Sequence, residues 1–175
     1  RELALFGEVS RRLAQHWTLT LGLRGYQVET EGETVGTGPL ILAAGTAESR
    51  NNATVRASGI NPKIALQYNA SEHVTSYAGV ARGFRFGGIQ LIAPSALSPN
   101  TPPTYAPDTV WSYELGLRTR WLDNTVTTDS AVFYIDWDDA QVRTTTGGAV
   151  PLNVIDNVGG ARSYGADLSL RYRTP

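Results

Sequence analysis

The feature that most constrains this chain is a hydrophobic pattern that repeats every second residue over several long stretches. In the stretch 109–122, the phase from Trp111 to Trp121 is apolar or aromatic except for Thr119, and the phase from Ser112 to Arg120 is polar apart from Gly116. Residues 17–24, 60–69 and 163–173 repeat the alternation. Because successive side chains of a strand point to opposite faces, this period predicts β-strands that each have one apolar and one polar face.

Three further stretches are less regular. Residues 3–12 fit a strand, although the same stretch also fits a helical stripe; we favour the strand because Gly7 weakens a helix interior. Residues 74–82 and 125–137 have the composition of strands, but apolar residues fall in both phases, so their phase stays open. The sequence therefore predicts an all-β fold of about seven strands.

Short and long connections alternate along the chain. The short links fall at residues 13–16, 70–72 and 122–124, and the long links fall at residues 31–58, 84–108 and 145–157. In an antiparallel up-and-down sheet this order places every tight turn at one end and every long loop at the other. That asymmetry is typical of transmembrane β-barrels of the bacterial outer membrane, which have short periplasmic turns and long extracellular loops.

Aromatic residues support the same interpretation. Trp17, Tyr68, Trp121 and Tyr172 each lie beside a short turn or the position where one is expected, in the apolar phase of the strand. This is the expected place of an aromatic girdle at a membrane interface. Trp111 and Tyr113 would begin the opposite girdle. The strand from Trp111 to Trp121 is ~33 Å long, and a tilt of ~40° projects this to ~25 Å of bilayer.

Two other architectures are compared with the barrel. A membrane-spanning helix does not fit, because the longest charge-free run, residues 86–107, contains five prolines. A soluble β-sandwich or solenoid remains the alternative, with the apolar faces packed against a second sheet. Strands of a β-sandwich usually have about five to seven residues, whereas the strands predicted here are longer. A sandwich also does not require all short turns at one end and all long loops at the other.

Composition narrows the chemistry. The chain has no cysteine, two histidines and a net charge of −1, so Cys-based metal sites and a basic surface for nucleic acid are not expected. His16 and His73 fall in or beside short turns, away from the end where an outer-membrane hydrolase needs its base. We therefore expect no enzyme activity, no cofactor and no metal site. Asp136, Asp138 and Asp139 are expected to form a solvated strand end, with a calcium contact as the alternative.

Four segments in order resemble one family, the TonB-dependent outer-membrane receptors. They are residues 81–88 (ARGFRFGG), 105–119 (YAPDTVWSYELGLRT), 131–142 (AVFYIDWDDAQV) and 157–168 (NVGGARSYGADL). Residues 5–8 (LFGE) and 21–26 (LGLRGY) are similar too. The branch that the chain most resembles is the receptors for iron complexes.

This resemblance implies a fold, a location and a function. Residues 1–175 would be an internal stretch of a large plugged barrel, with the plug domain and the remaining strands absent. The whole protein would be located in the outer membrane of a Gram-negative bacterium. It would import a scarce nutrient, a ferric siderophore above all, with energy from the proton gradient delivered by TonB. Its partners would be TonB, its own plug, membrane lipid and the ligand. A passive porin and a soluble β-protein that binds a ligand are the competing functions.

Two groups of residues are candidates for function. Charged residues in the polar phase are expected to face the lumen and to pair with neighbouring strands or with the plug: Glu8, Arg24, Lys63, Glu114, Arg118, Arg120, Asp167, Arg171 and Arg173. Residues at the extracellular rim are expected to contact an anionic or planar ligand: Arg82, Arg85, Phe84, Phe86 and Tyr105. Anchoring of the loop and the outer girdle is the equal alternative for the rim residues. The apolar patch at residues 39–44 is expected to pack against neighbouring loops.

Overall fold

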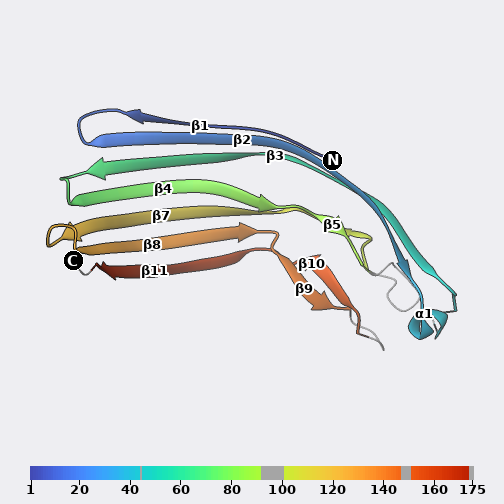
Figure 1. Cartoon of the computed structure of the whole chain (residues 1–175). Helices are drawn as coiled ribbons and strands as arrows, with labels where there is room; N and C mark the ends of the chain where they lie inside the picture. The colour runs from blue at the N-terminus through green and yellow to red at the C-terminus, as the bar shows by residue number, and fades with distance from the viewer. Residues whose placement is uncertain (44, 92–100, 147–150, 174–175) are drawn as a thin grey trace.

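The protein is one long antiparallel sheet with small hairpins at one end (Figure 1). It is a computed structural model that describes residues 1–43, 45–91, 101–146 and 151–173. The seven strands of the sheet lie in chain order: β1 (Glu2–Arg12), β2 (Trp17–Gly36), β3 (Ser49–Asn69), β4 (Val74–Arg85), β7 (Asp108–Trp121), β8 (Val126–Asp138) and β11 (Ala161–Tyr172). Each strand pairs antiparallel with its neighbours, so the predicted up-and-down topology and strand number are confirmed. Residues 3–12 lie in a strand, as favoured.

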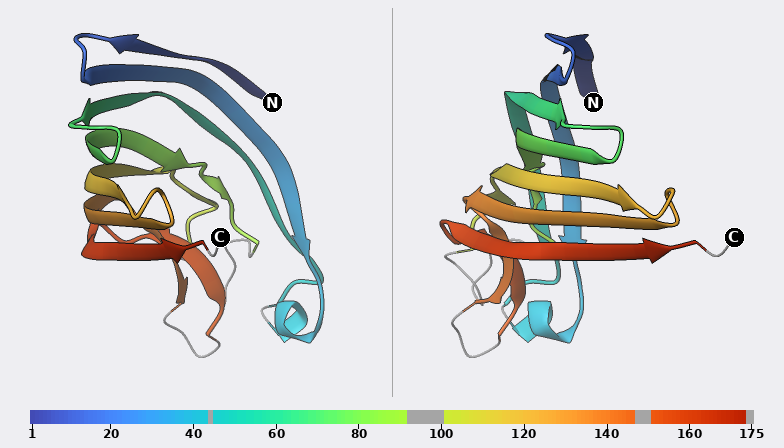
Figure 2. Two further views of the ribbon diagram at one scale, coloured as in Figure 1. Left: turned by 60° about the vertical axis from the view of Figure 1, so that its left-hand side comes forward. Right: turned by 90° about the vertical axis from the view of Figure 1, so that its left-hand side faces the viewer.

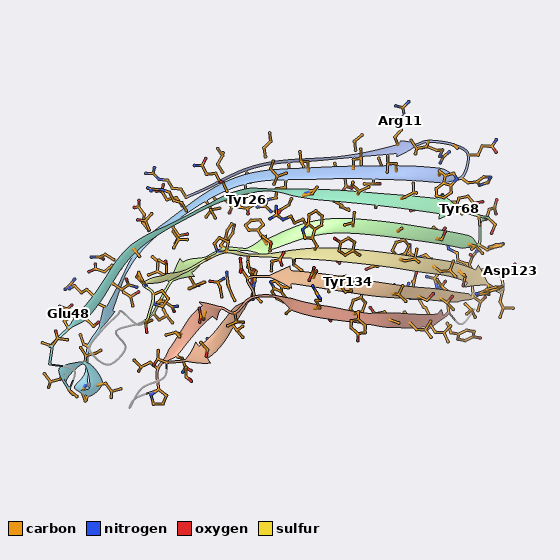
Figure 3. The ribbon with its side chains drawn as sticks, turned by 180° about the vertical axis from the view of Figure 1, so that it is seen from behind. Arg11, Tyr26, Glu48, Tyr68, Asp123 and Tyr134 are labelled. Carbon is orange, nitrogen blue, oxygen red and sulfur yellow. The ribbon has the colours of Figure 1, made fainter. Side chains whose placement is uncertain are left out.

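The two ends of the sheet differ as the link lengths predicted. Short turns join β1 to β2, β3 to β4 and β7 to β8 at one end, which Tyr68 and Asp123 mark in Figure 3. The opposite end carries the remaining elements: α1 (Pro39–Ala43), the pair β5 (Gly88–Ile89) and β6 (Thr104–Tyr105), and the pair β9 (Gln141–Thr145) and β10 (Asn153–Asn157). We call these the turn end and the loop end. No helix among the described residues is long and apolar enough to cross a bilayer.

The long links contain more structure than the sequence predicted. Residues 31–58 were expected to form a single loop, but β2 and β3 stay paired from Trp17 with Tyr68 to Gly36 with Ser49. We call the part of this hairpin formed by residues 27–36 and 49–58 the outer hairpin. Both of its faces are mostly polar, and in β2 glutamates occupy one phase and threonines the other, so no strong hydrophobic period marks the strands. Residues 84–108 and 145–157 likewise hold paired segments, in β5 with β6 and in β9 with β10.

The register divides the main sheet into two faces. Residues directly opposite each other on paired strands share a face. Leu21 lies opposite Val9 and Ile64, and Leu115 lies opposite Ala78 and Val132. We call the face shared by these residues the apolar face, and the other the polar face. Thr119, the exception in its phase, is 7% exposed and accepts a hydrogen bond from the Trp121 indole nitrogen at 2.6 Å.

The register also settles the two phases that the sequence left open. In β4, Val74, Ala78 and Val80 share the apolar face, whereas Tyr77 lies on the polar face opposite Gly116. In β8, Val126, Val132 and Tyr134 share the apolar face, and Phe133 lies on the polar face opposite Gly165. Large rings on the polar face are what blurred the pattern. Each ring needs a glycine beside it, because a Cβ on Gly116 would lie 2.2 Å from Cζ of Tyr77.

The seven strands form a single curved layer, and the described residues place no second sheet against its apolar face (Figure 2). Leucines in the middle of that face are therefore exposed in this chain, with Leu115 58% and Leu168 79% exposed. A soluble β-sandwich would bury them.

Candidate functional site

Polar-face charges are paired across the strands of the sheet. Arg24 Nη2 lies 2.8 Å from Glu2 Oε1 on the adjacent strand, and Lys63 Nζ of β3 reaches past β2 to lie 2.9 Å from Glu8 Oε2 of β1. Arg118 likewise pairs with Asp129 on β8. Glu114 is matched by a hydroxyl, because Tyr77 donates a hydrogen bond to its Oε1 at 2.7 Å. The sequence named Glu8, Arg24, Lys63, Glu114 and Arg118 as candidates but missed the partners Glu2, Asp129 and Tyr77.

A second group of polar-face charges has no such partner. Within the described ranges, Arg120, Arg171 and Arg173 make no ion pair with a carboxylate, and neither does Asp167 with a cation. The three arginines line a depression of about 250 Å³ at the turn end, together with Asn124, Thr125 and Thr127. This part of the polar face therefore presents uncompensated positive charge.

Aromatic side chains on the apolar face gather in two bands. At the turn end the rings of Trp17 and Tyr68 lie 4.6 Å apart, and Trp121 and Tyr172 both lie opposite Val126. Nearer the loop end, the rings of Tyr113 lie 6.4 Å from those of Trp111 and 6.1 Å from those of Tyr134.

Tyr134 in turn lies opposite Tyr164, which extends the second band onto the last strand. The sequence did not assign Tyr134 to this band because the phase of residues 125–137 was open. Tyr164 was in the apolar phase of residues 163–173, but the register is what places it beside Tyr134.

Charge returns to the apolar face beyond the second band. Arg162 Nε donates a hydrogen bond to Asp136 at 3.2 Å, one pair of positions past Tyr134 and Tyr164. On the outer hairpin Arg56 Nε donates to Glu29 at 2.7 Å. The continuous apolar surface therefore ends near the second band. Across the described segments, no three His, Asp or Glu side chains group closely enough to hold a metal ion.

An aromatic cluster lies at the loop end of β4. The rings of Tyr26 and Phe84 stack with centroids 3.7 Å apart and planes 5° apart. Phe86 packs edge-on against Phe84 at 4.8 Å and against Tyr26 at 6.3 Å. We call Tyr26, Phe84 and Phe86 the aromatic cluster; Figure 3 shows Tyr26 between the turn end and the loop end. Tyr26 was not among the sequence candidates, although its place in the polar phase of β2 is readable from the alternation.

The other rim candidates lie apart from this cluster. Arg82 has the same register phase as Phe84, but its Nη1 donates to the Ile60 carbonyl oxygen at 3.2 Å. The Tyr105 ring lies against Gly88, where a Cβ would be 2.3 Å from the hydroxyl oxygen. The five predicted rim residues therefore do not converge on one point.

Arg85 is held by a buried carboxylate. Its Nε donates to Asp108 Oδ2 at 3.0 Å, and its Nη2 donates to Asp108 and to the Gln141 carbonyl oxygen. Asp108 is 1% exposed and also accepts from the Gln141 amide nitrogen at 3.0 Å. Burial by itself raises the pKa of Asp108, but hydrogen bonds from Arg85 and Gln141 favour the carboxylate and leave the pKa below its ordinary value. Asp108 is therefore ionised at neutral pH.

These features together define a class of protein. A meander with turns at one end, long loops at the other, an apolar face bounded by aromatic bands and a polar, ion-paired face is part of the wall of an outer-membrane β-barrel. Residues 1–173 match the family described as TonB dependent receptor-like, beta-barrel. The chain belongs to that family, whose members are outer-membrane proteins of Gram-negative bacteria.

Solved structures share this fold. The ferric yersiniabactin uptake receptor FyuA of Yersinia pestis is 18% identical with a TM-score of 0.78, over 99% of this chain and 24% of that one. The ferric-catecholate import receptor Fiu of Escherichia coli K12 is 18% identical with a TM-score of 0.68, over 99% and 26%. The hemophore receptor HasR of Serratia marcescens is 15% identical with a TM-score of 0.70, over 99% and 32%. This chain thus spans about a quarter to a third of these receptors.

Proposed function

We propose that this chain is part of the barrel of a receptor that imports a scarce nutrient across the outer membrane. The match of residues 1–173 to the TonB-dependent receptor barrel carries the proposal. The ligand we propose is a ferric siderophore, since two of the similar structures are an uptake receptor for ferric yersiniabactin and an import receptor for ferric catecholates. Energy would come from the proton gradient through TonB. Transport requires no bond to be made or broken, so we propose no enzyme activity.

We further propose that the apolar face contacts lipid and the polar face lines the lumen. Supporting this, the apolar face carries the exposed leucines between two aromatic bands. The opposite face carries ion pairs that would be costly in hydrocarbon, such as Lys63 with Glu8. The predicted girdle of Trp17, Tyr68, Trp121, Tyr172, Trp111 and Tyr113 would then lie at the two interfaces.

The arginines without an ion-pair partner at the turn end suggest that another element contacts this part of the polar face. Arg24, Lys63 and Arg118 have carboxylate partners on the polar face, but Arg120, Arg171 and Arg173 have none among the residues described. We propose that carboxylates of the plug domain, or of the strand that would follow β11, supply the missing charge. Asp167 would pair in the same way with a cation of one of these elements.

For the ligand, we propose that the aromatic cluster supplies most of the contact at the rim. Tyr26, Phe84 and Phe86 offer ring faces and edges that suit a planar or catechol-like group. Arg82 and Arg85 remain proposed contacts for an anionic ligand, although Arg85 is also bound to Asp108. The proposed role of Tyr105 is to shape the loop beside them.

Uptake of iron-55 complexes tests this function. A strain that lacks the complete gene should lose uptake of at least one ferric siderophore in a panel, and the gene should restore it only in a TonB-positive host. Restoration without TonB would instead indicate a passive channel. Loss of oligosaccharide uptake with every iron source unaffected would refute the siderophore assignment.

A further inference from the structure

Among the described residues, a group of buried residues lies at the loop end of the sheet, where three segments meet. Asn51 of the outer hairpin is 4% exposed, Gln90 of the β4–β7 link is 2% exposed and Val154 of β10 is 8% exposed. Asp108 and Ala140 are also buried. Buried polar groups occur where their hydrogen bonds are satisfied, and these residues bond to one another's segments.

Gln90 bonds to all three segments at once. Its backbone oxygen accepts from Thr34 Oγ1 at 3.2 Å and from Asn51 Nδ2 at 3.3 Å, both on the outer hairpin. Its own amide nitrogen donates to the Pro103 carbonyl oxygen at 3.0 Å.

The side chain of Gln90 reaches the third segment. Its Oε1 accepts from the Ile155 amide nitrogen at 3.1 Å, and its Nε2 donates to the Ile155 carbonyl oxygen. The side-chain amide thus pairs with both backbone groups of one residue, as a neighbouring strand would. Among the described side chains, Gln90 is the one that bonds to both backbone groups of Ile155, in the middle of β10.

A second set of bonds connects the same segments to the aromatic cluster. Gln141 Nε2 donates to the carbonyl oxygens of Phe86 and Ala106, each at 2.9 Å. Asn157 Nδ2 donates to the Ala106 oxygen at 3.0 Å, and its Oδ1 accepts from the Ala106 nitrogen at 2.8 Å. The backbone position of Phe86, whose ring packs on Phe84, is therefore set from the β9–β10 hairpin.

Close packing reinforces the contact between the link and the outer hairpin. Ile89, next to Gln90, lies against Gly32 of β2, where a Cβ would be 2.9 Å from Cδ1 of Ile89. A side chain at residue 32 would require the end of the Ile89 side chain to move, so glycine permits this close contact.

We propose that Gln90 is a positioning residue that fastens the three loop-end segments into one preformed unit, and that this unit holds the aromatic cluster in place for ligand. The three segments therefore open together and not one by one. Loss of the Gln90 side-chain amide removes the hydrogen bonds of the half-buried Ile155 nitrogen and oxygen to this segment, which favours opening. The ligand part rests on the proposed function; the coupling of the segments does not.

Hydrogen–deuterium exchange on the complete receptor in detergent tests the coupling without any ligand. In Gln90→Leu we expect exchange about tenfold faster in peptides that cover residues 49–55, 101–107, 141–145 and 153–157 together. Gln90→Glu should be intermediate, because its carboxylate still accepts from Ile155 nitrogen but cannot donate to the oxygen. Strand amides of β7 and β8 should be unchanged in both variants, which reports that the barrel is folded.

The matched control is Gln27→Leu, which removes an exposed glutamine on the outer hairpin. It should leave all four peptides at the wild-type rate. Faster exchange confined to residues 101–107, or equal effects of Gln27→Leu and Gln90→Leu, would overturn the proposal. Because no ligand is used, a failure here is distinct from a failure of the transport assignment.

Discussion

The ring of Tyr77 lies across Gly116 on the neighbouring strand, so closely that a Cβ at residue 116 would be 2.2 Å from Cζ of the ring. In this position the Tyr77 hydroxyl donates to Glu114 at 2.7 Å. Glycine on one strand thus leaves room for a ring from the next strand, and the hydroxyl of that ring hydrogen-bonds to a carboxylate on the polar face. The same arrangement recurs with Phe133 over Gly165.

Gly116→Ala should destabilise the barrel, because the ring must leave its position and its hydrogen bond to Glu114 is then lost. We expect a loss of about 1–3 kcal/mol in the free energy of unfolding. Urea titration of the complete receptor in lipid vesicles measures it. Gly25→Ala is the control, since a Cβ there meets nothing within 4 Å; equal effects of the two substitutions would contradict the packing described.

Asp108→Asn should weaken the loop end, because a buried carboxylate that binds Arg85 and the Gln141 amide is replaced by a neutral amide. We expect a cost of about 1–3 kcal/mol at neutral pH. The local opening free energy from exchange of the Gln141 amide measures this cost. Asp138→Asn, at an exposed strand end, is the matched control.

The pH dependence of that cost has a definite sign. The pKa of Asp108 is lower in the folded protein than its ordinary value of about 3.9. The stabilisation is therefore complete above the ordinary value and disappears as pH falls through the lowered folded value. The difference between wild type and Asp108→Asn should be constant from pH 5 to 7 and shrink below about pH 4. A difference that grew on acidification would show that the carboxylate is not held ionised.

Arg171→Gln and Arg120→Gln should weaken the attachment of the plug domain if its carboxylates pair with these arginines. Because a displaced plug opens the pore, the urea concentration at which the complete receptor begins to conduct ions in a planar bilayer should then fall. Arg143→Gln, on β9 at the loop end, is the charge-matched control and should leave that concentration unchanged. Unchanged conductance in all three variants, with a less stable barrel in Arg171→Gln, would indicate pairing with the strand after β11.

The sequence predicted the sheet well because its pattern is local. The alternation at Trp111, Tyr113, Leu115 and Leu117 defines strand and face together, and tight turns mark where strands reverse. The phase or the extent of a strand could not be predicted where both of its faces carry the same kind of residue. Tyr77 on the polar face of β4 hid its phase, and polar residues on both faces hid the outer hairpin.

The loop end could not be predicted for a different reason. Gln90 bonds to Thr34, Asn51 and Ile155, and these contacts span 39 to 65 residues of sequence. No local spacing signals such a partner set. Arg85 was named from its position at the rim, but its carboxylate partner Asp108 follows 23 residues later and became visible only in the fold.

The central claim is that alternate side chains of β7 and β11 face lipid, and single-cysteine labelling measures this directly. The sequence contains no cysteine, so one can be placed at a time at Leu115, Leu117 or Leu168, or at Glu114, Arg118 or Asp167, in a complete receptor freed of any other cysteine. A fluorophore on each cysteine, in vesicles of brominated lipid, should be strongly quenched at the three leucine positions and little affected at the three charged positions. Quenching at Glu114, Arg118 and Asp167, or equal quenching at all six, would contradict the account.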